Sequence, residues 1–149
     1  FQVAAACCAA GADIFPINRA FFTVKTPARI RLESFLGSSI RFYADGTVGL
    51  CRLTRSDMAR LQATEDDADD LSGFARTIEG VEIGILIREL ADGTGKISLR
   101  TGEAYNAATL CRQLGGGGHR AAAGASVPGG VDAAEQAILD TLARAGVQL

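Results

Sequence analysis

The stretch GGGGHRAAAG, residues 115–124, departs furthest from what a packed core needs. Glycines give up side-chain packing and lose the most chain entropy on ordering, so a folded domain keeps them where the backbone adopts a positive φ or approaches a ligand. We expect valine at Gly117 to be strained for that reason, and to reduce stability and ligand binding together. Successive bare N–H groups can converge on an anion, and the next two residues can add a ring N–H and a guanidinium. The stretch therefore predicts a phosphate-binding site made by Gly115, Gly116, Gly117, Gly118, His119 and Arg120.

Two plainer interpretations of this stretch remain open. A glycine run is also typical of a flexible linker, although the helical pattern of 105–114 before it and the apolar residues after it leave too little chain for a further domain. His119, the one histidine of the chain, could be a core residue. A buried imidazole normally lies within an apolar pattern, whereas His119 follows glycines and precedes an arginine.

Hydrophobic periodicity in the rest of the chain indicates an α/β fold. Apolar residues alternate or cluster as in strands, with an Asp45-Gly46 hairpin turn between the first two and the most buried strand at 81–90. Helix patterns and helix-start signals precede, separate and follow these strands. We expect a central mixed β-sheet of about five strands flanked by helices, with an N-terminal helical connector over 1–37 and a binding domain over 38–149. The predicted strands are 39–44, 47–53, 81–90, 96–101 and 122–127, and the predicted helices are 3–10, 14–22, 26–37, two opening at Thr54 and Thr64, 105–114 and 133–145.

Arg100 is the second candidate for the phosphate site. It ends a predicted strand on the polar side, with Ser98 on the same face, and a guanidinium can hold two phosphate oxygens at once. The simpler interpretation is an exposed arginine at a strand end. Asn106, just beyond this strand, is a weaker candidate for ligand contact.

Composition argues for a small anionic ligand and against catalysis by this chain alone. The net charge is −2, so no broad cationic face for long duplexes is expected. Metal-assisted phosphodiester cleavage needs several Asp and His ligands around its metal ions, and one histidine does not supply them. We therefore expect no catalytic residue and no metal site here, and we interpret the acidic run 65–70 as a helix start.

Cysteine usage and hydropathy place limits on the environment. The four cysteines show no Cys-x-x-Cys spacing, which makes a zinc site improbable and favours a reducing cytoplasm. No apolar run is long enough for a membrane span, so no membrane partner is expected. The sequence begins with Phe1 rather than Met, which predicts that it was cut from a longer protein.

These residues resemble a known family. GGGGH followed by two residues and Ala-Ala-Gly at 115–124 is similar to the signature of the DHH-associated domain, the C-terminal domain of DHH-family phosphoesterases. Ser-Leu-Arg-Thr at 98–101 resembles the strand end of that family, and 11–29 resembles its connector. Together with 38–90, these segments are most similar to the branch of bifunctional oligoribonucleases and phosphoadenosine-phosphate phosphatases.

The resemblance implies a domain that holds short RNA or a small phosphorylated nucleotide while an N-terminal catalytic domain of the same protein supplies divalent metal, with manganese expected there. The intact protein would then be a phosphoesterase, and a homodimer is left open. One alternative is a stand-alone RNA-binding module, like the C-terminal domain of alanyl-tRNA synthetases, whose motif differs after the glycines. Another is a purely structural or oligomerising domain.

Overall fold

The structure is a computed structural model of the 149-residue chain, and it describes residues 1–68 and 71–149. Regular elements account for most of this length. In chain order they are α1 (Gln2–Ala9), α2 (Ile14–Asn18), the π-helical turn η1 (Arg19–Thr23), α3 (Pro27–Ser39), β1 (Arg41–Tyr43), the 3₁₀ turn η2 (Ala44–Gly46), β2 (Val48–Leu53), α4 (Arg55–Arg60), α5 (Glu65–Ala68), the 3₁₀ helix η3 (Leu71–Thr77), β3 (Ile83–Glu89), β4 (Gly95–Thr101), α6 (Ala107–Arg112), β5 (Gly117–His119), β6 (Ala122–Val127) and α7 (Gly130–Arg144).

The strands form one mixed sheet, which confirms the predicted fold class. Its order is β1-β2-β3-β4-β6-β5, with β2 and β3 parallel and every other neighbouring pair antiparallel. The sheet has six strands rather than about five. The additional strand, β5, lies within the glycine stretch, where there is no alternation of apolar residues from which a strand could be predicted.

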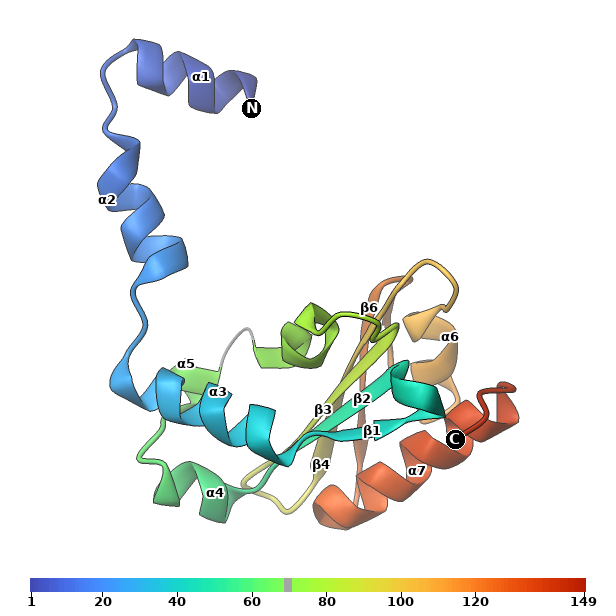
Figure 1. Cartoon of the computed structure of the whole chain (residues 1–149). Coiled ribbons are helices and arrows are strands. Elements are labelled where there is room, and N and C mark those ends of the chain that lie inside the picture. Colours follow the sequence, from blue (N-terminus) through green and yellow to red (C-terminus); the bar gives the residue numbers. More distant parts are fainter. Residues whose placement is uncertain (69–70) are drawn as a thin grey trace.

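Two hydrophobic clusters lie on opposite faces of this sheet, and Figure 1 shows the helices that flank it, α3 on one side and α6 and α7 on the other. One face packs against α6 and α7, and its cluster draws on β2, β3, β4 and β6. The other packs against α3, the end of α5 and η3, but its strand residues come from β2 and β3 alone. Among the residues described, this second cluster leaves the half of the face formed by β4, β6 and β5 without a hydrophobic cover. A ligand can reach the sheet there.

The central position of β3 follows from its composition. Residues 83–87 of β3 are all buried, because one face of the strand meets the cluster packed against α6 and α7 (the α7 cluster) and the other face meets η3. Gly84 permits the close approach of η3: a Cβ at this position would lie 2.8 Å from Cγ of Arg76. This fixes η3 beside β4, where the site begins.

The N-terminal segment divides at α3. Figure 1 shows α1 and α2 standing away from the sheet, and the residues of both helices are exposed. Helix α3 instead buries Leu32 and Leu36 in the second cluster. The predicted boundary between 37 and 38 falls inside this helix, and the division into connector and binding domain stays a prediction.

Local signals succeeded at helix starts and failed at one turn. Thr54 and Asp57 form the expected capping box, and Thr64 and Asp67 exchange equivalent hydrogen bonds at the start of α5. The acidic run continues into 69–70, which lie outside the described residues. The tight Asp45-Gly46 turn is wrong: Tyr43 pairs with Val48, so four residues connect β1 and β2. Helix η3 was not predicted.

Candidate functional site

A cleft of about 640 Å³ lies on the uncovered half of the sheet. Its charged lining side chains are Arg88, Lys96 and Arg100, and no acidic residue lines it in the part of the chain that is described. The uncharged lining comes from the end of α5, from η3, β3, β4 and β6, and from glycines 115–118. In a chain of net charge −2, three cations along one cleft make a local positive potential that favours anions.

Arg100 reaches the cleft because β4 alternates. Ile97 and Leu99 are buried in the α7 cluster, so Ser98 and Arg100 face the cleft. The guanidinium of Arg100 donates hydrogen bonds to Oγ of Ser72 on η3, at 2.7 Å, and to the carbonyl oxygen of Leu99, at 3.1 Å. These bonds hold the fork at the cleft wall without neutralising its charge, because neither acceptor is ionised.

The glycine stretch forms the outer wall of the cleft as an edge strand. In β5, Gly117 lies opposite Gly124 of β6, and the next residues continue this pairing. A Cβ on Gly116 would lie 2.1 Å from the Gly124 carbonyl oxygen, and one on Gly118 would lie 2.6 Å from the Ala122 carbonyl oxygen. Glycine at these two positions therefore lets β5 pack against β6. An edge strand also leaves some backbone N–H groups unpaired, which are available to a ligand.

Gly115 and Gly117 have different roles in the run. Gly115 has a φ of 74° and follows α6, where the N–H of Gly116 bonds back to the Cys111 carbonyl oxygen at 2.9 Å. This is the left-handed geometry that ends many helices. Gly117 has no positive φ, and a Cβ there meets no heavy atom within 4 Å. The expectation that valine at Gly117 would be strained is therefore wrong, because the positive φ values occur at Gly115 and Gly118.

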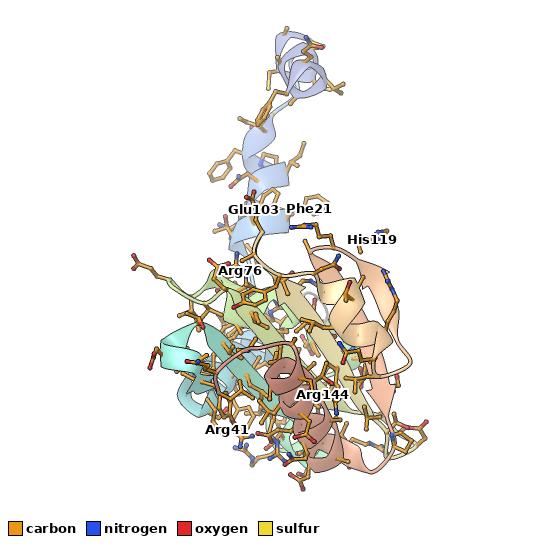
Figure 2. The ribbon with its side chains drawn as sticks, turned by 90° about the vertical axis from the view of Figure 1, so that its right-hand side faces the viewer. Phe21, Arg41, Arg76, Glu103, His119 and Arg144 are labelled. Atoms are coloured by element: carbon orange, nitrogen blue, oxygen red, sulfur yellow. The ribbon has the colours of Figure 1, made fainter. Side chains whose placement is uncertain are left out.

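His119 lies at the rim of the uncovered face. It pairs with Ala122, which pairs in turn with Arg100, so the register puts His119 and Arg100 on one row and one face of the sheet. Two strand spacings of about 4.8 Å separate them. The imidazole is exposed and has no hydrogen-bond partner among the described residues, and Figure 2 shows it at the outer margin of the molecule. It is not a core residue.

Arg120 and Asn106 lie away from Arg100. The guanidinium of Arg120 donates to the Glu103 carbonyl oxygen at 2.6 Å and lines a separate cavity of about 500 Å³ with Arg76. Asn106 caps α6 by accepting the Thr109 N–H at 3.2 Å. The structure thus groups Arg100 with the four glycines and sets these two residues apart from them.

Sequence reasoning missed four polar contributors to the cleft: Ser72, Arg88, Lys96 and Ser126. Lys96 could have been found, since it shares the two-residue period of Ser98 and Arg100. Arg88 could not, because its position depends on the pairing of β3 with β4, where it lies directly opposite Lys96.

The described residues include the cations of the cleft but no candidate metal site. No group of three or more His, Cys, Asp or Glu side chains in the described ranges could hold a metal ion. The described residues therefore supply no site for the metal ions on which DHH-family enzymes depend. Nor does any helix of the described chain have the length and apolar character to cross a membrane.

Comparison with known proteins identifies the family of this chain. Residues 53–145 match the DHHA1 domain model, and the chain belongs to this family. It is 32% identical over 127 residues to the bifunctional oligoribonuclease and PAP phosphatase NrnA of Thermus thermophilus, covering 82% of this chain and 37% of that protein. This confirms the predicted likeness to the oligoribonuclease and phosphatase branch, and the chain spans little more than a third of that relative.

Two solved structures share the fold. An exopolyphosphatase-related protein from Bacteroides fragilis matches with a TM-score of 0.87 at 23% identity, over 96% of this chain and 42% of that one. PggH from Vibrio cholerae, a pGpG-specific phosphodiesterase, matches with a TM-score of 0.55 at 15% identity, over 78% of this chain and 39% of that one. In both, this chain corresponds to less than half of a longer protein.

Proposed function

We propose that this chain is the substrate-gripping domain of a metal-dependent DHH-family phosphoesterase that acts on short RNA or small phosphorylated nucleotides. The observation that carries the proposal is the cleft beside β5, where Arg100 and four glycines meet and every charged lining residue that the structure describes is basic. The name of the Thermus relative, an oligoribonuclease and PAP phosphatase, supports the same class of substrate.

The cleft suits one phosphate at its Arg100 end. The Arg100 fork can bind two oxygens, and the exposed N–H groups of the β5 edge can bind others. Lacking a side chain, Gly117 lets the ligand approach the strand directly. His119 can add a ring N–H from the rim of the same face. Arg120, whose side chain turns to the second cavity, is the weakest member of the proposed set.

The catalytic metals belong, in this proposal, to a preceding domain, with manganese as the expected ion. The exposed apolar residues of the N-terminal segment support it, because a partner domain would cover them; Phe15, Phe21 and Phe22 are 70%, 78% and 79% exposed. Residues 1–37 would then end that domain and connect it to the sheet. We also propose a cytoplasmic location, since all four cysteines are free, and a homodimer remains a hypothesis.

The test is binding of adenosine 3′,5′-bisphosphate and of a 5′-phosphorylated diadenylate to the chain by calorimetry, with EDTA present. Arg100→Ala should lose about 1.5–3 kcal/mol of binding free energy, or about ten- to a hundredfold in affinity, because a charge-assisted hydrogen bond is removed. His119→Ala should lose less, and it should leave the melting temperature unchanged because the ring is exposed. Arg112→Ala, at an exposed arginine of α6, is the control.

Two results would count against the proposal. Unchanged affinity in Arg100→Ala would mean that the cleft does not hold the phosphate. Tightening on long duplex RNA, with a steep dependence on salt, would instead favour the stand-alone RNA-binding module. With manganese added, the chain should hydrolyse neither ligand. Turnover that survives repurification and disappears in His119→Ala would contradict the division between grip and catalysis.

A further inference from the structure

The end of the cleft away from Arg100 carries two more cations. Arg88 on β3 and Lys96 on β4 are register partners, and both line the cleft. Lys96 is exposed and has no hydrogen-bond or ion-pair partner within the described chain. The Lys96 ammonium and the Arg88 guanidinium carry like charges and repel each other, and a bound anion between them would relieve this repulsion.

Arg88 has a weak internal partner. Its Nη1 lies 3.0 Å from Oε2 of Glu65, with the arginine side chain 16% exposed and the glutamate side chain 76% exposed. A carboxylate so exposed is largely hydrated, and such pairs contribute little to stability. Glu65 therefore pairs with Arg88 in the free domain, and a more strongly bound anion can displace it.

The two cationic ends are too far apart for one phosphate. Lys96 and Arg100 lie on one face of β4, four residues apart, which separates their Cα atoms by about 13–14 Å. Between them the floor is small: Ser98 lies opposite Gly124, which lies opposite Gly117. A sugar-phosphate backbone can lie close to such a floor, and cationic grooves that follow the backbone are typical of proteins that bind single strands.

We propose that Arg88 and Lys96 form a second phosphate subsite, which makes the domain prefer short oligonucleotides with separated phosphates over mononucleotides. The inference rests on the proposed function, in which the Arg100 end holds one phosphate. The second subsite holds another phosphate further along the strand, and Glu65 leaves Arg88 as that phosphate binds. Length preference then arises within this domain, independently of any metal.

The test compares AMP with the 5′-phosphorylated triadenylate pApApA, titrated calorimetrically with EDTA at several KCl concentrations. Lys96→Ala should weaken pApApA binding about fivefold and lower its salt slope by about 0.7, while AMP binding stays unchanged. Glu65→Gln should tighten pApApA binding about twofold by releasing Arg88. Lys25→Ala removes the only other lysine, which pairs with Glu33 outside the cleft, and should change neither ligand.

The outcomes separate this inference from the function on which it rests. If Arg100→Ala weakens both ligands but Lys96→Ala weakens neither, or weakens both equally, the second subsite is wrong and the proposed function stands. If Lys25→Ala matches Lys96→Ala, the effect is general charge and the subsite is again wrong. If the chain binds neither ligand, both proposals fail.

Discussion

Replacing Gly118 with alanine should destabilise the domain far more than the same replacement at Gly117, the residue before it. At Gly118 the new Cβ would lie 2.6 Å from the carbonyl oxygen of Ala122 and from Cα of Ala123, and the backbone has a φ of 146°. Overpacking of this kind costs about 1–3 kcal/mol, and a residue with a side chain at such a φ costs about 1–3 kcal/mol more. At Gly117 neither term applies.

The expected free-energy changes are well separated. Gly118→Ala should lower the free energy of unfolding by about 2–6 kcal/mol, a large part of the 5–15 kcal/mol typical of a domain. In a chain of this length that corresponds to a melting temperature lower by roughly 4–24 °C. Gly117→Ala should stay within about 1 kcal/mol and can even stabilise, since alanine restricts the unfolded chain. It should nevertheless weaken ligand binding, because the methyl group enters the cleft.

The assay is thermal unfolding followed by circular dichroism, with calorimetric binding of 5′-phosphorylated diadenylate to each folded variant. Gly73→Ala is the matched control: it lies in η3 outside the cleft, and a Cβ there meets nothing within 4 Å. Equal destabilisation at Gly117 and Gly118 would refute the pairing of β5 with β6 as argued. Full ligand affinity in Gly117→Ala would refute the close approach of the ligand to β5.

Three further predictions concern the rest of the fold. Burial alone would raise the pKa of Asp57, but hydrogen bonds from Thr54 and an arginine outweigh it and hold the pKa below 3.8. This carboxylate therefore stabilises the fold above about pH 4, and its contribution is lost as the pH falls through the lowered pKa. In Asp57→Asn, the free energy of unfolding should therefore fall less steeply as the pH is lowered below about 4. Burial raises the pKa of Cys51 and Cys111 to about 11. A disulfide reagent at about pH 8 should therefore label only the two exposed cysteines, Cys7 and Cys8, until the protein unfolds. Rapid labelling of all four thiols in the folded protein would contradict this. Glu135, 8% exposed, accepts hydrogen bonds from two arginines and a tyrosine of β1 and β2; Glu135→Ala should lower stability by about 1–3 kcal/mol in the same thermal assay, and an unchanged melting temperature would mean that the network contributes nothing.

Periodicity in the sequence was sufficient for most strands because their side chains report their own burial. The alternation of Ile97 and Leu99 with Ser98 and Arg100 predicts both the strand and the face that lines the cleft. Strand β5 shows no alternation of apolar and polar residues, because its glycines have no side chains, and its extended form depends on pairing with β6. Helix η3 was missed for a related reason, since it lies against the sheet through Gly84, a contact distant in sequence.

Only those residues of the candidate site whose position depends on a single strand could be predicted from the sequence. Arg100 was predicted because its position depends on β4 alone. Arg88 joins the cleft through strand order, and Arg120 leaves it because its side chain turns toward the Glu103 carbonyl after β5 ends. Neither effect is encoded in the spacing of the motif. Adjacency within the GGGGHR run therefore does not by itself place all of its side chains beside one cleft.

The glycine run combines three physical requirements that happen to be contiguous. Gly115 ends α6 with a positive φ, Gly116 and Gly118 permit backbone contact with β6, and Gly117 faces the open cleft. Successive residues of a strand point to opposite faces, so packing and ligand access must alternate along β5. A side chain at Gly116 or Gly118 would push the edge strand away from β6, and would therefore disturb the wall of the cleft and lower the stability of the fold. A side chain at Gly117 would leave the wall in place and fill the space beside it. The position of a substitution within this run, more than its size, thus decides whether the fold or the binding is lost.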